Sequence, residues 1–76
     1  MYAVIWDNAQ DPPKPIGRVL LVDGVAVPVG DVAEMLDDMN VGVPGKTLTY
    51  EDGPDYIRAL PKVLRGYPVG AEVVDE

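Results

Sequence analysis

The chain has 76 residues, 13 acidic and 6 basic, which gives a net charge of −7. It contains no Cys, His or Ser. This excludes disulfides, thiolate metal sites, and catalysis by a Ser or Cys nucleophile with an imidazole base. The acidic balance also disfavours direct binding to nucleic acid or to anionic membranes.

The length allows a single domain over residues 1–76. A domain this small buries only roughly 60% of its unfolded surface, and small domains often gain stability from a disulfide, a metal or a partner chain. With disulfides excluded, we expect self-association, as a homodimer, or another protein partner. No secretory signal pattern opens the chain, and no apolar run approaches the ~20 residues of a membrane span. A cytoplasmic protein is therefore expected.

Residues 1–6 are predicted to form a strand, with Tyr2, Val4 and Trp6 on one face. A loop follows over residues 7–15, where three prolines favour extended polyproline geometry. We interpret this loop as a stiff connection between strands. A Pro-rich ligand for a groove is the alternative.

A β-hairpin is predicted over residues 17–29, because two runs rich in Val and Leu flank Asp23-Gly24, a pair typical of type I′ turns. Counting outward from the turn places Leu20, Val22, Val25, Val27 and Val29 on one face and Val19, Leu21, Ala26 and Pro28 on the other. Both faces are apolar, and one layer of helices cannot easily cover both. A second chain could cover the remaining face, so Val25, Val27 and Val29 are candidate partner-binding residues. Pro28 favours an edge strand or a bulge at this position.

Apolar spacing predicts a short helix at about Val32–Met39. Asp31 is the expected N-cap, with Glu34 completing a capping box, and Asn40 is the expected left-handed C-cap. Residues 40–46 are predicted to form a loop.

A second helix is predicted after residue 52, with Asp52 as its cap and Pro54 in its first turn. Pro61 predicts a kink or two short helices, and Gly66 is expected to end the second. A strand is expected over residues 71–74, with Asp75 and Glu76 frayed beyond it. These elements together predict an α+β fold, in which a small antiparallel sheet (N-terminal strand, Asp-Gly hairpin, C-terminal strand) packs on two short helices.

The region from Thr47 to Tyr67 carries a pattern of Thr49, Glu51-Asp52-Gly53, Tyr56, Arg58-Ala59-Leu60-Pro61 and Arg65-Gly66-Tyr67. It resembles a segment of small uncharacterised bacterial proteins in which a Thr-x-x-Asp-Gly start leads to Ala-Leu-Pro and then Gly-Tyr. The chain departs from that pattern at Tyr50, where the segment has Pro, and by placing Pro54 directly after Gly53. The resemblance implies a bacterial or phage source and attaches no activity.

Few residues suggest a catalytic, phosphate-binding or metal site. The sequence VGVPGKT at residues 41–47 ends like a phosphate-binding loop but lacks the first Gly at the required spacing. The carboxylates form no Asp-x-Asp-x-Asp-Gly loop and are interpreted as solvated acidic surface. We therefore expect no enzyme activity, no cofactor and no metal.

Three basic residues, Arg58, Lys62 and Arg65, share one face if the second helix continues through Pro61. Pairing with the acidic first helix, within the chain or across a dimer, is the preferred interpretation, and phosphate binding is the alternative. These three residues and Tyr67 complete the candidate partner-binding set.

The sequence thus predicts a non-enzymatic protein-interaction module, of the inhibitor, antitoxin, immunity or accessory-subunit type. The alternative is an acidic mimic of nucleic acid. In that case the acids would occupy a basic site on a DNA- or RNA-binding enzyme and would have to form one continuous surface. A small enzyme built on carboxylates, Tyr and Lys is a third, weaker hypothesis.

Overall fold

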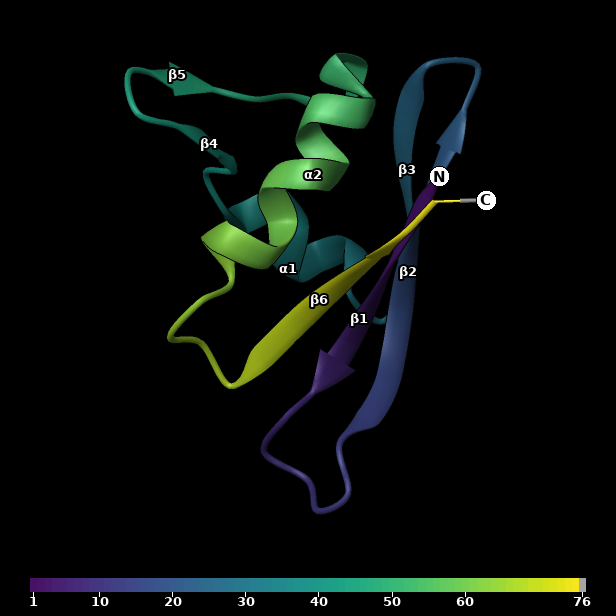
Figure 1. Ribbon diagram of the computed structural model, residues 1–76, viewed down its shortest axis with the longest axis vertical. Helices are drawn as coiled ribbons and strands as arrows, with labels where there is room; N and C mark the ends of the chain where they lie inside the picture. Colours follow the sequence, from purple (N-terminus) through teal and green to yellow (C-terminus); the bar gives the residue numbers. More distant parts are fainter. Residues whose placement is uncertain (76) are drawn as a thin grey trace.

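The computed structural model describes residues 1–75 and places a four-stranded antiparallel sheet against two helices (Figure 1). The predicted α+β fold is therefore confirmed, while Glu76 lies outside the described residues. Along the chain the elements are β1 (Tyr2–Asp7), β2 (Lys14–Val22), β3 (Val25–Gly30), α1 (Ala33–Asp38), β4 (Gly42–Val43), β5 (Lys46–Thr47), the 3-10 helix η1 (Tyr50–Asp52), α2 (Pro54–Val63) and β6 (Val69–Val74). No helix within residues 1–75 has the length and apolar character needed to cross a membrane.

The predicted hairpin is confirmed in its turn and its register. Asp23 and Gly24 have φ of 50° and 80°, as a type I′ turn requires. Val22 pairs with Val25 across the turn. The strand order is β3-β2-β1-β6, so the Pro28 strand does lie at an edge, where a missing N–H breaks no ladder. The proline-containing loop returns the chain from β1 to β2 and includes a cis peptide bond between Asp11 and Pro12.

The core lies between the helices and one face of the sheet. The sheet contributes Ala3, Ile5, Val19 and Ala26, and the helical layer contributes mainly Leu36, Tyr56, Ile57, Leu60 and Leu64. Alternation along each strand produces this division, because successive side chains point to opposite faces. Both helices cover the same face (Figure 1).

The expected caps of α1 are wrong. The N-cap is Val32, without a side-chain hydrogen bond, and the C-cap is Met39 in an extended conformation. The chain leaves β3 through Gly30 at φ 89°, and the N–H of Asp31 donates to the carbonyl of Ile16, so Asp31 lies in a turn before the helix. Asn40 has no left-handed φ, because the extended chain continues from Met39 toward β4.

The start of α2 also differs from prediction. Asp52 ends η1, and the N-cap of α2 is Gly53 at φ 52° and ψ −110°. Pro54 opens the helix as expected. Pro61 is accommodated inside one continuous helix. Of the two predicted outcomes, a kink or two short helices, the second is therefore wrong. Pro61 is only two residues from the helix end, and the next turn is still closed by a 2.9 Å bond from the N–H of Leu64 to the carbonyl of Leu60.

The predicted loop at residues 40–46 contains a small hairpin. Val43 pairs with Lys46, and Gly42 pairs with Thr47 around a Pro44-Gly45 tip. The strands have two residues each, which is too short to show a period-2 pattern in the sequence. The hairpin projects beside α2 (Figure 1).

Candidate functional site

The sheet face turned away from the helices is apolar and has no cover within residues 1–75. We call it the open face; its strand residues are Tyr2, Val4 and Trp6 of β1, Arg18, Leu20 and Val22 of β2, Val25, Val27 and Val29 of β3, and Glu72 and Val74 of β6. Val22, Val25 and Val29 are 48%, 36% and 38% exposed. Figure 1 shows no element over this face. The structure thus brings the three predicted β3 valines together on one accessible surface.

The rows of this face follow from the strand register. One row runs across all four strands as Val27, Leu20, Tyr2 and Val74. The next row runs as Val29, Arg18, Val4 and Glu72. Arg18 and Glu72 are the two charged members of the face as defined above. Neither forms an ion pair with another described residue.

A second surface is a groove of about 340 Å³ between the β4–β5 hairpin and α2. Leu48 and Ala59 are apolar and largely buried at its base. Its cations are Lys46 from β5 and two predicted residues of α2, Arg58 and Lys62. The full lining is Gly42, Val43, Pro44, Lys46, Leu48, Asp55, Arg58, Ala59 and Lys62.

The other two predicted residues of the second helix region do not join this groove. Arg65 follows the end of α2, in a turn that contains Gly66 at φ 92°. Tyr67 is 57% exposed on the connection to β6. The helical spacing of Arg58, Lys62 and Arg65 therefore holds only for the first two. The predicted ion pairs with the acidic first helix are not formed within the chain, because the one ion pair among residues 1–75 joins Lys46 to Asp52. Pairing across a dimer stays a prediction.

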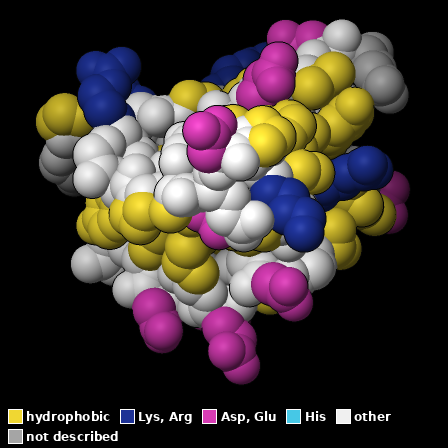
Figure 2. Space-filling model, turned by 90° about the horizontal axis from the view of Figure 1, so that it is seen from below, with side chains coloured by type: hydrophobic (Ala, Val, Ile, Leu, Met, Phe, Trp, Pro, Cys, Tyr) yellow, Lys and Arg dark blue, Asp and Glu magenta, His cyan; other side chains and the backbone are white. Residues whose placement is uncertain are grey.

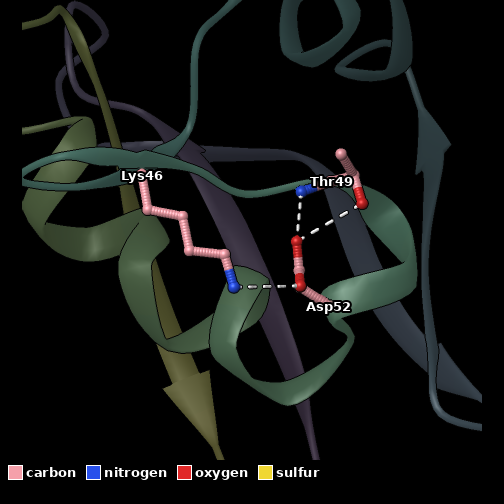
Figure 3. Close-up of polar contacts among 3 residues, drawn as sticks. All are labelled: Lys46, Thr49 and Asp52. Carbon is pink, nitrogen blue, oxygen red and sulfur yellow. Dashed lines mark hydrogen bonds and ion pairs between the residues drawn. The ribbon is translucent and has the colours of Figure 1, made fainter.

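From the sequence, Lys46 is expected to be a solvated loop residue. In the structure its ammonium lies 3.7 Å from the Asp52 carboxylate (Figure 3). The same carboxylate accepts a 2.6 Å bond from the Thr49 N–H and a 3.3 Å bond from the Thr49 hydroxyl. The bond from the Thr49 backbone, helped by Lys46, lowers the pKa of Asp52. This cluster ties the β5 strand to η1 and so supports one wall of the groove.

Two tyrosines form a further cluster that the sequence analysis missed. The rings of Tyr50 and Tyr56 are 5.1 Å apart, and the Tyr50 hydroxyl donates a hydrogen bond to Asp37. Burial, together with the bond to Asp37, raises the pKa of Tyr50 above its usual range, and burial raises that of Tyr56. Both hydroxyls therefore stay protonated near neutral pH. No helical period links the two residues in the sequence, because η1 ends and α2 begins between them.

The carboxylates of residues 1–75 are the remaining candidate groups. Within residues 1–75 there is no group of three or more acidic side chains placed to hold a metal ion. Three acids are already engaged: Asp7 with Ala9 and Gln10, Asp37 with Tyr50, and Asp52 with Thr49 and Lys46. In the view of Figure 2, acidic side chains stand apart, with apolar, neutral and basic groups between them. That face therefore lacks the continuous acidic surface that a nucleic-acid mimic needs.

Comparison with family models, with curated proteins and with solved structures finds no match. The resemblance of Thr47–Tyr67 to small bacterial proteins therefore stays a prediction.

Proposed function

We propose that the protein is a non-enzymatic interaction module of the cytoplasm, which binds a protein partner through the open face of its sheet. The partner can be a second copy or another protein, as for an inhibitor, antitoxin, immunity factor or accessory subunit. No nucleic acid or membrane is a direct partner in this proposal.

The exposed valines of the open face support this proposal most strongly. On β2 and β3, three valines remain accessible to water, although the opposite side of the same strands is covered by helices. Large connected apolar patches on small domains commonly mark protein-binding surfaces. Burial of such a surface contributes roughly 25 cal/mol per Å² before the costs of association are counted. A partner would also supply burial that a domain of this size otherwise lacks.

The groove between the β4–β5 hairpin and α2 is a competing surface. Its two free cations, Arg58 and Lys62, favour an acidic ligand, but Asp55 lies on the same lining and reduces its positive charge. We therefore rank the open face first and use the hairpin as the control surface.

A matched pair of substitutions tests the proposal. Val25 and Val43 both flank a hairpin turn, and they are 36% and 51% exposed, so Asp at either position disturbs the isolated chain to a similar extent. Val25→Asp places a charge on the open face, whereas Val43→Asp places it beside the groove. The protein, immobilised, is exposed to lysate of its source cells and to differently tagged copies of itself, and bound chains are quantified by mass spectrometry.

We expect Val25→Asp to reduce specific capture about tenfold, because an unpaired charge would be buried at the interface. Capture by the Val43→Asp variant should stay near the wild-type level. Loss with Val43→Asp alone would move the site to the groove. Unchanged capture by both variants would contradict the proposal.

The acidic mimic is the weaker candidate, supported by the net charge of −7. If the protein is such a mimic, its capture of a partner should fall steeply as the salt concentration rises, and DNA should compete with it. Capture through an apolar face should instead be nearly insensitive to DNA.

A further inference from the structure

We infer that a second copy of this chain pairs with the free edge of the sheet, so that β6 of one copy lies antiparallel to β6 of the other. The two sheets then join side by side into one continuous sheet, and the two-fold axis stands perpendicular to it. This inference goes beyond the proposed function, because it concerns the edge of the sheet and not its open face.

The bonds between β6 and β1 show which backbone groups of β6 are free. The N–H of Asn8 donates to the carbonyl of Pro68 at 2.9 Å, and the register of the two strands continues from there without a shift. In an antiparallel ladder, every second residue directs its N–H and C=O groups to the same neighbouring strand. The residues of β6 at even positions therefore face β1, as Pro68 does. The outward-facing residues are Val69, Ala71 and Val73.

These outward-facing groups have no backbone partner within residues 1–75. β6 is the last strand in the sheet order, and none of the backbone bonds formed outside the helices and strands involves its outward-facing residues. In Figure 1 no other strand of the sheet lies beyond β6. The strand contains no Pro, and its one charged residue is Glu72. Strand edges of this kind readily accept a further strand.

The opposite edge of the sheet, formed by β3, is closed to such pairing. In a two-residue hairpin the residues that flank the turn are hydrogen-bonded to each other, so Val25 faces β2 and every second residue from Ala26 on faces outward. Pro28 is one of these and has no N–H, and Gly30 turns the chain away at φ 89°. The helix η1 also packs against β3. Because only one edge is open, pairing of β6 with β6 gives a closed dimer and not a filament.

One register uses all the free groups of β6 at once. It places Ala71 opposite Ala71 of the second copy, with Val69 opposite Val73 on either side. Each of these pairs exchanges two hydrogen bonds, and no outward-facing N–H or C=O of β6 is left over. Glu72 lies opposite Gly70, so no two carboxylates are directly opposed. This match of the strand to itself favours a second copy over a strand of another protein.

The two neighbouring registers are worse. A shift in one direction places Glu72 directly opposite Glu72, which is repulsive. A shift in the other direction leaves Val73 without a partner in the strand. The strand therefore specifies the register that is centred on Ala71.

The edge dimer leaves the open face available. Because the axis is perpendicular to the sheet, both open faces lie on the same side, and β3 of each copy lies at an outer end of the joined sheet. Val25 of β3 is thus far from the contact. Each copy has a net charge of −7, so the copies repel each other, and the contact between two strands is small. We therefore expect a reversible dimer that forms as the concentration rises.

Two substitutions at the centre of the contact test the pairing. Ala71→Pro removes an N–H that the ladder to β1 does not use, so the chain should still fold. It should weaken the dimer about tenfold or more, because the central pair loses both of its bonds. Ala71→Val is the matched control, because it adds similar bulk but keeps the N–H, and it should dimerise at least as well as wild type. Light scattering over a concentration series, in about 0.5 M salt to screen the repulsion, measures the masses, and circular dichroism confirms folding.

Single cysteines test the register, since the natural chain contains no Cys that could interfere. The Cα atoms of a hydrogen-bonded pair are about 5.5 Å apart, which suits a disulfide, so Ala71→Cys should cross-link two copies under mild oxidation. Glu72→Cys is the control, because the two residues 72 lie about 7–8 Å apart on a diagonal and should cross-link far more slowly. Faster cross-linking of Glu72→Cys than of Ala71→Cys would overturn this pairing.

A wild-type chain that stays monomeric at all concentrations would overturn the inference, and so would an Ala71→Pro chain that dimerises like wild type. If the wild type stayed monomeric and Ala71→Pro abolished its capture of a different protein, the edge would belong to that protein. The open face is tested separately, because copies held through β6 are lost with Ala71→Pro and kept with Val25→Asp. The capture experiment with Val25→Asp, repeated in the Ala71→Pro chain, therefore reports on the open face alone.

Discussion

The two faces of the sheet contain similar apolar residues but have opposite environments. On β1, Ile5 is fully buried under the helices, whereas its neighbour Val4 points to the open face and is only partly buried. The same holds along β2, where Val19 is fully buried and Val22 is 48% exposed. Two short helices provide one layer of cover, and a single layer covers one face. Strand composition therefore shows how much apolar surface has to be buried, whereas the number of helices determines how much of it the chain can bury alone.

Two adjacent residues of β1 should differ strongly in what their substitution costs. Ile5→Ala should destabilise the protein by about 3 kcal/mol, because it leaves a cavity under the helices. Val4→Ala should cost about 1 kcal/mol or less, because its side chain is partly exposed. Urea unfolding at low protein concentration measures both, so that association through the open face does not contribute. Equal losses from the two substitutions would contradict the division into covered and open faces.

A second prediction concerns the contact that fixes the helical layer on the covered face. A Cβ added at Gly53 would lie 2.0 Å from the Gly24 carbonyl oxygen, at the tip of the β2–β3 hairpin. Gly53 also has φ 52° and ψ −110°, which L side chains rarely adopt. Gly53→Ala should therefore cost about 2–4 kcal/mol. The change is expected to lower the thermal midpoint markedly.

Gly45→Ala is the matched control, because Gly45 has φ 84° but open space around the added Cβ. It should cost only about 1–2 kcal/mol, the usual penalty of a left-handed residue. A Gly53→Ala loss no greater than that of Gly45→Ala would show that the close approach to Gly24 is not needed.

The cluster around Asp52 should make the stability of the fold slightly dependent on pH. Its pKa is lowered in the folded protein by the bond from Thr49, below an ordinary value of 3.8. A carboxyl group whose pKa is lower in the folded than in the unfolded protein stabilises the fold at pH values above its unfolded-state pKa. This contribution is lost as the pH falls through its folded-state pKa. Between about pH 5 and pH 3, wild-type stability should therefore fall more than that of Asp52→Asn. The thermal midpoints of the two proteins measure this, and parallel pH curves would argue against the contribution.

The sequence predicted the elements whose signals are local. Asp23-Gly24 determined the turn type and therefore the register of every pair along the β2–β3 hairpin. Alternation then gave the membership of each face. Pro28 indicated the edge position, because proline has no N–H to donate to a second neighbouring strand.

The parts that sequence reasoning missed depend on contacts that helical and strand periods do not reveal. Asp31 has the chemistry of a cap, but the bond of its N–H to Ile16 of β2 holds it in a turn. Asp52 likewise has the chemistry of an α-helix cap, yet it closes η1 because Thr49 lies within reach of its carboxylate. The helical period grouped Arg58, Lys62 and Arg65, but α2 ends before the third. The groove escaped prediction because its other wall is a hairpin with two residues per strand.

The pairing of β1 with β6 also has a consequence for folding. Tyr2 pairs with Val74, so the central strand β1 is synthesised well before its partner strand β6. Contacts so distant in sequence form slowly, because a long loop must close before they contribute. Until β6 pairs with it, one edge of β1 exposes unpaired backbone groups beside Val4 and Ile5. Exposed strand edges of this kind can pair with other chains. During synthesis the nascent protein therefore passes through a stage in which this edge is open, and we expect its yield to depend on how quickly the last strand follows.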